Sequence, residues 1–417
     1  MEADFDIAVC GGGLVGLMFA NLVSHTNYRV ALIDAGPAPA SASAMTASLR
    51  GAELVSGYAP RVSALNASSM ALLERCGVLS QLHRYARFSE MVVKDGEGTG
   101  AIRFSAEDAG LPHLGMVIEN HWVVEVLFQR LKKLENVELL FDTEVSGISE
   151  SSVVNDTGAD TGIGTNTAAN PCTVIQFGGD RSLTCDLVVG ADGGNSRVRE
   201  LKGLKTGGWS YDQAAVVTTI QTEGAHHNIP RQWFTAEGPL AFLPLADPTL
   251  CSVVWSHSDA PSLLNLAPEA LCALLTEASE SDLGEVVAVD QRFSFTLKQQ
   301  HAYRYVRRGT ALIGDAAHTI HPLAGQGANL GFADAEALAM ELRQTRFSGE
   351  KPGDIAVLRR FSRARQPHNL AIAAAMEILK RMYGQQTPGV GWLRNQAMSV
   401  LNQSGALKTI MMKLVNS

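Results

Sequence analysis

Three stretches of this chain join glycine to a carboxylate at spacings suited to holding a large anionic ligand. The first is Gly11-Gly-Gly-Leu-Val-Gly16, which follows the apolar run Phe5–Cys10 and opens a helical pattern over residues 14–24. A second apolar run, Val30-Ala-Leu-Ile, ends in Asp34. This order of strand, Gly-x-Gly-x-x-Gly, helix, strand and acid is the dinucleotide-binding fingerprint.

The glycines and the acid of this first stretch have distinct physical roles. Gly11 permits the tight turn, Gly13 lets a pyrophosphate approach the backbone, and Gly16 lets the helix close on the strand. The free amides at the helix start face the phosphates. Asp34 is expected to accept hydrogen bonds from an adenosine ribose. A glycine triplet alone indicates only a tight turn, but its whole context agrees here, and we predict dinucleotide binding.

The other two stretches place an acid beside a glycine just after a buried strand. Asp192-Gly193 follows the apolar run 187–191, and Asn195 and Ser196 come next as candidate helix caps. Alone, this stretch would indicate a plain strand-turn-helix junction. Gly314-Asp315 follows the apolar residues 311–313 and precedes a proline- and glycine-rich loop that opens onto a long helix. A carboxylate past a strand end and free amides at a helix start suit a polar, partly anionic cofactor.

Other chemically active side chains carry weaker signals. His318 and His321 are candidates for acid–base groups, although such histidines more often shape a loop. Arg61, at an expected loop-to-helix junction, suits either a cofactor phosphate or a solvated charge. The six cysteines are scattered without the spacing of a zinc site. We therefore expect reduced core cysteines, a reducing compartment such as the cytosol, and no metal.

Length and charge set the scale of the molecule. A chain of 417 residues predicts two intimately packed domains. The net charge of −8 argues against a nucleic-acid partner. The apolar run 7–23 has no basic residue before it and glycines within it, unlike a signal peptide. No other stretch approaches the ~20 apolar residues that cross a bilayer, so we expect a soluble protein or one at a membrane surface.

The elements around the three stretches fall into two groups. Strand patterns at 91–94 and 101–104 indicate a second domain, which continues between residues 209 and 300 as antiparallel strands over the cofactor. Residues 61–66 and 115–120 are expected to enter helices, and residues 137–141 are expected to form a strand. The second domain is expected to contain strands at 215–221, 231–235, 240–245, 250–256 and 293–297 and a helix at 268–277. Its aromatic side chains, expected in the core or a pocket wall, are Trp233, Phe234, Phe242, Trp255 and Phe295.

The remaining segments have little pattern of their own or lie at the end of the chain. Residues 37–60 are rich in Ala, Ser, Gly and Pro and predict a mobile loop near the cofactor. Residues 149–170 are polar and predict an exposed hairpin excursion. The basic helix face at 358–365 is expected to be solvated or salt-bridged. Apolar residues recur at helical spacing over 393–417, so this tail suits a membrane surface, a partner or its own domain.

Together, the motifs resemble the class A flavoprotein aromatic hydroxylases, the family of para-hydroxybenzoate hydroxylase. The likeness covers nearly the whole chain and is closer still to the ubiquinone-biosynthesis hydroxylases, in particular the bacterial 2-polyprenylphenol hydroxylases. The Trp-x-Trp-x-Ile-Pro motif of the halogenase branch is absent. The further stretches that carry the likeness are Arg61-Val-Ser-Ala-Leu-Asn66, His113-Leu-Gly-x-x-x-Glu-Asn120, Leu240-Ala-Phe-Leu-Pro-Leu-Ala-Asp-Pro248, Ser252-Val-Val-Trp255 and His318-Thr-Ile-His-Pro-Leu-Ala-Gly-Gln-Gly327.

The resemblance implies an α/β fold with a Rossmann-like FAD-binding domain, an antiparallel-sheet substrate domain and C-terminal helices. We expect these at 1–85, 111–205 and 301–345 for FAD binding, at 86–110 and 206–300 for the substrate, and at 346–417 for the helices. Asp315 would bind the ribityl and pyrophosphate region, and Asp192-Gly193 would also serve the passing NAD(P)H. The residues implied to bind FAD are Gly11, Gly13, Leu14, Val15, Gly16, Asp34, Arg61, Asn120, Asp192, Gly193, Gly314, Asp315, Pro322, Gly325, Gln326, Gly327, Ala328 and Asn329.

The chain departs from the family pattern at two cofactor positions. Asp34 replaces the commoner Glu, which should be tolerated because both present a carboxylate. Ala328 is smaller than the usual residue, so the surroundings of the flavin are expected to be roomier.

The resemblance also implies the reaction. NAD(P)H reduces FAD, O2 adds to it, and the C4a-hydroperoxyflavin hydroxylates a polyprenylated phenol in ubiquinone biosynthesis. Gln326, Gly327 and His321 would lie nearest to chemistry that the flavin itself mainly carries. The implied setting is the cytoplasm, at the inner face of the membrane, with other ubiquinone-biosynthesis proteins or a lipid-presenting protein as partners. A flavin hydroxylase of a soluble aromatic compound and a non-catalytic FAD-binding sensor remain as alternatives.

Overall fold

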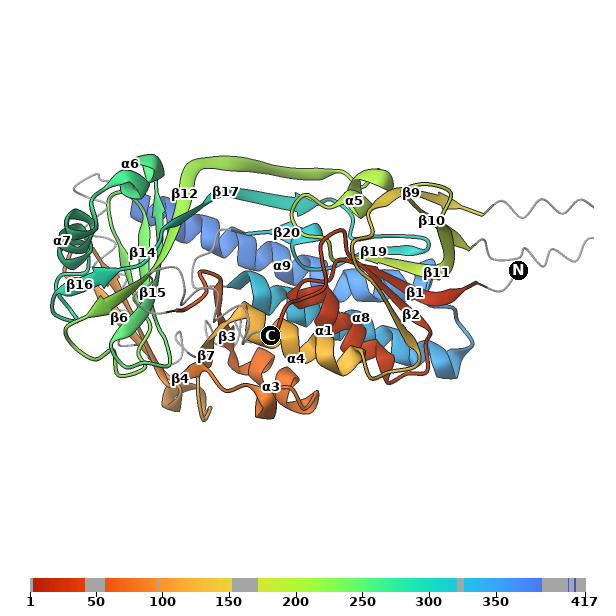
Figure 1. The fold of residues 1–417 in the computed structure, drawn as a ribbon, viewed down its shortest axis with the longest axis horizontal. Coiled ribbons are helices and arrows are strands. Elements are labelled where there is room, and N and C mark those ends of the chain that lie inside the picture. The colour runs from red at the N-terminus through yellow and green to blue at the C-terminus, as the bar shows by residue number, and fades with distance from the viewer. Residues whose placement is uncertain are drawn as a thin grey trace, which may run out of the picture.

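The computed structural model describes residues 3–41, 57–96, 98–151, 172–320 and 326–384, together with Ser404 and Thr409. The molecule is elongated, with a mainly parallel sheet toward one end and an antiparallel sheet at the other (Figure 1). Helix α8 (Gln326–Ser348) lies against the first sheet, and α9 (Ile355–Gly384) runs from the first sheet toward the second. Most of the segments predicted as a mobile loop at 37–60, as a hairpin excursion at 149–170 and as a C-terminal tail at 393–417 lies outside the described residues.

The parallel sheet has the strand order β18-β19-β11-β1-β2-β8, and the pairs from β19 to β8 are parallel. Strands β9 and β10 extend it as an antiparallel meander beside β11, and β18 pairs antiparallel with β19. Its strands are β1 (Phe5–Cys10), β2 (Val30–Ile33), β8 (Val137–Leu140), β9 (Val145–Glu150), β10 (Thr173–Phe177), β11 (Ser182–Gly190), β18 (Val306–Arg307) and β19 (Thr310–Leu312). The predicted strand–helix–strand unit at the N-terminus is confirmed.

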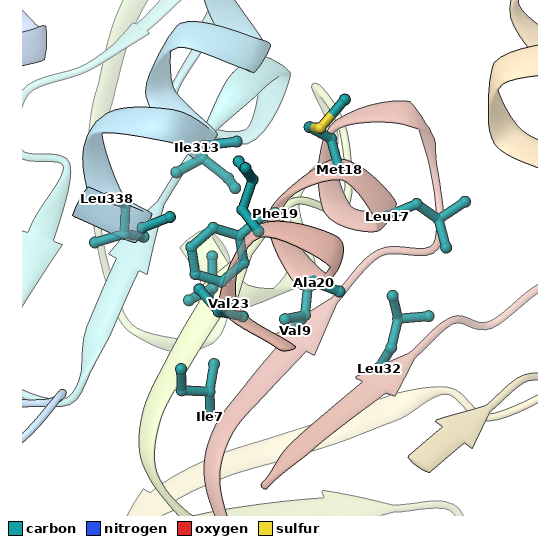
Figure 2. Close-up of a cluster of buried hydrophobic side chains, with 14 of the residues drawn as sticks. Ile7, Val9, Leu17, Met18, Phe19, Ala20, Val23, Leu32, Ile313 and Leu338 are labelled. Atoms are coloured by element: carbon teal, nitrogen blue, oxygen red, sulfur yellow. The ribbon is translucent and has the colours of Figure 1, made fainter. Parts of the chain in front are cut away.

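Helix α1 (Leu14–Ser24) lies in the centre of the core beside this sheet. Every residue from Gly16 to Ser24 is buried, because the helix packs on the sheet, on α4 (Asn120–Leu131) and on α8. Phe19 lies beside both Ile313 and Leu338, so the helix contacts the strand end and α8 at the same place (Figure 2). A helix that is apolar all round is stable only when buried in this way.

The second sheet has the order β20-β17-β12-β15-β14-β13-β5-β6, with β16 also pairing with β12. Its pairs are antiparallel except β13 with β5, so the predicted antiparallel pattern is confirmed with one parallel exception. Its strands are β5 (Glu90–Asp95), β6 (Ala101–Ser105), β12 (Thr206–Thr222), β13 (Arg231–Phe234), β14 (Pro239–Pro244), β15 (Leu250–His257), β16 (Val286–Val289), β17 (Phe293–Ala302) and β20 (His318–Thr319). Helices α6 (Ala260–Asn265) and α7 (Pro268–Ala278) contribute to the core cluster that contains Trp233, Phe242 and Trp255.

A third, three-stranded sheet lies between these two and was not expected. It has the order β3-β7-β4, with β3 (Val62–Asn66), β4 (Tyr85–Phe88) and β7 (Gly115–Glu119). The expectation that residues 61–66 and 115–120 enter helices is therefore wrong for most of each segment. The helices α3 (Ala67–Arg75) and α4 begin only after the strands end, and the Asn66 side chain accepts from the Ser69 amide as the cap of α3.

Smaller elements complete the fold. The 3-10 turns are η1 (Leu79–Gln81), η2 (Glu107–Ala109) and η3 (Gly314–Ala316), and α5 (Arg197–Leu201) follows β11. The Ser196 side chain caps α5 as predicted, whereas Asn195 instead accepts from the Lys298 ammonium at 2.6 Å. Across the described parts of the chain, no helix is long and apolar enough to cross a membrane. All six cysteines are free thiols.

Candidate cofactor site

A cavity of about 770 Å³ lies at the carboxyl ends of the parallel strands. Ligands of open α/β sheets bind at this edge, and sites for small molecules span about 300–1,000 Å³. The cavity is lined from the ends of β1, β2, β11 and β19, from β3, and from the starts of α1 and α8. The predicted site residues that line it are Gly11, Gly13, Leu14, Val15, Asp34, Arg61, Asn120, Asp192, Gly193, Asp315, Gly327 and Ala328.

The glycines of the first turn are held by steric contacts with neighbouring backbone. Gly11 has φ +116°, and a Cβ there would lie 2.2 Å from the Ala191 carbonyl oxygen. A Cβ on Gly16 would lie 1.9 Å from the Gly11 carbonyl oxygen, so this residue keeps helix and turn in contact. A Cβ on Gly13 would meet no protein atom within 4 Å. Gly13 therefore leaves space that a ligand can use.

Helix α1 presents free amides to the same space. Gly13 is its N-cap and provides no side-chain hydrogen bond. The first amide bonded within the helix is that of Leu17, which donates to the Gly13 carbonyl at 2.9 Å. The amides before it, and the positive end of the helix dipole, make this an anion-binding position.

Asp34 is oriented by the backbone on both sides of it. One carboxylate oxygen accepts from the Gly12 amide at 2.5 Å and the other from the Gly36 amide at 2.7 Å. Each carboxylate oxygen has a second lone pair for a further donor. Asp34 is thus fixed at the cavity with accepting capacity left, as ribose binding requires.

Two buried oxygens at the cavity wall lack any hydrogen-bond partner among the described residues. Asp192 uses Oδ2 to accept from the amides of Arg197 and Val198 at 2.7 and 3.0 Å, but its Oδ1 is buried without a partner. Asn120 Oδ1 is likewise buried without a hydrogen-bond partner. Buried polar atoms are nearly always hydrogen-bonded, so these two fit a ligand that supplies hydroxyl or amide donors.

Asp315 lies in the tight turn Gly314–Ala316, which follows β19 and lines the cavity. Gly314 has φ +58° and packs against Val15 of α1, where its Cβ would be 3.2 Å from the Val15 methyls. The Asp315 carboxylate is open to the cavity, but protein surrounds it otherwise. Burial raises its pKa, and the positive charges of His318, Arg61 and Lys298 act in the opposite direction. Arg199 links this turn to the second stretch, because its guanidinium donates to the carbonyls of Ala316 and Gly194 at 2.8 Å each.

Several predicted residues lie elsewhere. Gly16 and Gly314 stand behind the cavity wall and shape it. Gln326 and Asn329 are buried, and Asn329 joins α8 to the small sheet by accepting from the Asn66 amide and donating to the Ala64 carbonyl. His318 is 1% exposed and bound to Asp334, away from the cavity. The predicted residues His321, Pro322 and Gly325 lie outside the described residues.

The cavity wall also contains residues that the sequence reasoning missed. Thr143, Glu144 and Val145 follow the end of β8, Ser63 lies on β3, and Arg197 begins α5. A signal for the first three existed, because β8 was predicted as a strand, and the ends of parallel strands meet at one edge. Arg61, left open between two roles, lines the cavity with its guanidinium 5.3 Å from the Phe295 ring centre.

Comparisons with known proteins agree with this geometry. A family model described as an FAD binding domain matches residues 4–374. The 3-demethoxyubiquinol 3-hydroxylase of Escherichia coli K12 is 31% identical over 410 residues, covering 97% of this chain and 96% of that protein. The mitochondrial ubiquinone biosynthesis monooxygenase COQ6 of Rattus norvegicus is 31% identical over 450 residues, covering 98% and 90%.

Solved structures share the fold over almost the full length. The p-nitrophenol 4-monooxygenase PnpA of Pseudomonas putida DLL-E4 superposes with a TM-score of 0.76 at 19% identity, covering 100% of this chain and 99% of that one. PqsL of Pseudomonas aeruginosa, a probable FAD-dependent monooxygenase, gives 0.75 at 19% identity, covering 96% and 100%. At this identity the likeness concerns the fold.

Proposed function

The chain belongs to the FAD binding domain family whose model matches residues 4–374, and from this premise we propose that it hydroxylates the ring of a polyprenylated phenol in ubiquinone biosynthesis. The protein is an FAD-dependent monooxygenase, and NAD(P)H and O2 are its co-substrates. The observation that carries the proposal is the 31% identity to a ubiquinone-pathway hydroxylase across 97% of the chain.

The residues around the cavity fit FAD. The space at Gly13 and the free amides of α1 suit a pyrophosphate, and Asp34 suits an adenosine ribose. The unpartnered oxygens of Asp192 and Asn120 provide acceptors for ligand donors. Asp315 is assigned to the ribityl chain. When bound, FAD supplies the redox chemistry, taking a hydride from NAD(P)H and delivering one oxygen atom of O2 to the ring.

The protein contributes position and electrostatics to this chemistry. Gly327 and Ala328 bring the start of α8 to the cavity, where the positive end of the helix dipole would stabilise negative charge on a reduced ring. Arg61 adds a positive charge beside Asp315. We assign the aromatic substrate to the region where the antiparallel sheet meets the small sheet, because Leu243 and Leu250 share an apolar cluster there with Val117. Such a cluster excludes water from the reacting atoms.

A polyprenyl chain requires a lipid-facing route. We place the protein in the cytoplasm at the inner membrane face, served by its C-terminal segment 393–417 or by a lipid-presenting partner. Removal of residues 393–417 should then abolish sedimentation with liposomes and activity on a long-chain substrate, while activity on a one-prenyl analogue remains. Unchanged sedimentation and long-chain activity would exclude this role for the segment.

The function is tested with the purified holoenzyme in two steps. Under anaerobic conditions, NADH or NADPH should bleach the flavin absorbance, and faster when a prenylated phenol is present. In air with 18O2, 2-prenylphenol or a prenylated demethoxyquinol should gain one labelled oxygen atom, whereas p-nitrophenol should gain none. Labelled product from p-nitrophenol alone would favour the soluble-aromatic alternative, and an unbleached flavin would favour the sensor.

A further inference from the structure

Asp334, on α8, forms a fully buried charged cluster directly behind the Gly314–Ala316 turn. Its side chain is 0% exposed, and it lies outside the cavity wall. One carboxylate oxygen accepts from His318 Nε2 at 2.5 Å and from the Gly314 amide at 3.1 Å. The other accepts from Arg365 Nε and Asn369 Nδ2, each at 3.0 Å. Four donors therefore converge on this one carboxylate.

The cluster keeps the Asp334 carboxylate charged. Burial opposes ionisation, but the charges of His318 and Arg365 outweigh it and hold the pKa of Asp334 at about 2. Hydrogen bonds to a charged group are shorter and stronger than neutral ones. The 3.1 Å contact from the Gly314 amide ends on this charged oxygen, so it restrains that peptide unit.

The restrained peptide unit precedes the cofactor-facing acid. Gly314 takes φ +58°, a left-handed conformation that the turn needs, and the Ala317 amide closes the turn on the Gly314 carbonyl at 2.8 Å. Asp315 stands inside this turn and faces the cavity. A rotation of the Gly314 peptide would carry the Asp315 carboxylate away from its present direction.

The cluster also connects the turn to the C-terminal helix. Arg365 and Asn369 lie one helical turn apart on α9, and Arg365 Nη2 donates to Asn369 Oδ1 at 3.0 Å. Asn369 donates in addition to the Tyr305 hydroxyl at 3.3 Å. Two helices, α8 and α9, therefore fix the geometry of a turn that is separate from both in sequence.

From this geometry we infer that Asp334 is a positioning residue for cofactor binding, fixing the Gly314 peptide so that Asp315 faces the ribityl and pyrophosphate region of FAD. The inference rests on the proposed assignment of Asp315 to FAD. It requires nothing of the aromatic substrate, so the substrate assignment can fail without affecting it.

The test is a double-mutant cycle on FAD affinity, measured by fluorescence quenching on apoproteins reconstituted with FAD. Asp334→Asn preserves size but sets an amide against the Gly314 and His318 donors, and should weaken FAD binding about 10- to 100-fold. Asp315→Asn should also weaken it. If Asp334 acts through Asp315, Asp334→Asn should cost less than about 3-fold in the Asp315→Asn background.

Controls separate positioning from general stability. Asp95→Asn alters another buried carboxylate, 1% exposed in the antiparallel sheet, and should leave FAD affinity within about 2-fold. If Asp334→Asn does not fold, His318→Ala replaces it in the same cycle, because it removes one donor and leaves the carboxylate charged. Equal losses of FAD affinity with and without Asp315, or no loss at all, would overturn the inference.

Discussion

The two turns that enclose the cofactor cavity are held in different ways. The Gly11–Gly16 turn is fixed by backbone packing, in which Gly16 touches the Gly11 carbonyl and Gly11 touches the Ala191 carbonyl. The Gly314–Ala316 turn is fixed by charged side chains, chiefly Asp334 through the Gly314 amide and Arg199 through the Ala316 carbonyl. The first turn is therefore held by steric contact between backbone atoms, and the second by hydrogen bonds to charged side chains.

This difference predicts how each turn fails. Where two backbone segments are in contact, no flexible side chain can move aside, so an added methyl group must move the main chain. A turn held by charged side chains depends on the ionisation of those side chains, so it is weakened gradually as the pH changes. Substitutions and acid should therefore damage the two turns in different ways, and the following experiments test that contrast in order of expected effect.

The largest effect is expected at Gly16. Gly16→Ala places a methyl group 1.9 Å from the Gly11 carbonyl oxygen, so α1 or its turn must shift in the middle of the core. We expect a loss of about 3 kcal/mol or more in the free energy of unfolding, measured by urea titration of the apoprotein, and loss of FAD.

Gly13→Ala is the matched control on the same turn. Its methyl group meets no protein atom within 4 Å, so stability should change by less than about 1 kcal/mol. FAD affinity should nevertheless fall, because the methyl group occupies the space assigned to the pyrophosphate. Equal stability losses for Gly16→Ala and Gly13→Ala would show that steric contact between backbone atoms does not hold this turn.

The second-largest effect is expected at Asp315. Substitution there should lower the affinity for FAD without lowering the free energy of unfolding of the apoprotein. Burial raises the pKa of this carboxyl, which means that the fold disfavours its charged form. Asp315→Ala should therefore leave the apoprotein as stable as the wild type or slightly more so, while FAD affinity drops about 100-fold. A purified variant that is yellow and fully loaded would contradict the assignment of Asp315 to the cofactor.

The contrast also explains what the sequence could predict. Apart from the Ala191 carbonyl that packs on Gly11, the determinants of the first turn lie within residues 5–34, and their order and spacing form the dinucleotide-binding fingerprint. The second turn was predicted as a cofactor loop, but its restraints were not. Asp334 and Arg365 come from two later helices, and a long-range ion pair leaves no periodic signal in a sequence. Arg365 looked like one more basic residue of a solvated or salt-bridged helix face.

The small sheet was missed for a related reason. Val62–Asn66 and Gly115–Glu119 are short apolar runs that lead directly into helices, and periodicity cannot separate a strand of five residues from a first helical turn. Their pairing joins residues about 50 positions apart in the chain, which only the tertiary fold reveals. As a result, Arg61 was placed at a helix start, whereas it precedes a strand at the cavity wall.

The smallest effect is expected from mild acid, and it should appear at the second turn. His301 pairs with His318 across the strands β17 and β20, and its Nε2 lies 3.4 Å from the Tyr305 hydroxyl of the charged cluster. Burial, followed by the charge of His318, lowers the pKa of His301 to about 4. Below pH 6.5 the unfolded chain therefore binds a proton that the folded protein refuses, and stability falls as the pH drops from 6.5 toward 4. Asp334 contributes its loss only at lower pH, between 3.8 and about 2, because its pKa is lowered.

Hydrogen exchange and urea titration at pH 7 and pH 5 test this order, with exchange corrected for its intrinsic pH dependence. Between pH 7 and pH 5 we expect the free energy of unfolding of the wild type to fall by about 1–2 kcal/mol because of His301. The corrected hydrogen exchange should increase more at residues 300–318 than at residues 7–20. His301→Asn should reduce the loss and remove the local gain. His121→Asn is the matched control, because burial and then Arg84 lower the pKa of His121 to about 4 as well, at the start of α4. It should reduce the global loss while exchange at residues 300–318 still rises. If exchange at residues 300–318 still rose in both variants, the acid sensitivity of this region would not come from His301 beside the Gly314–Ala316 turn.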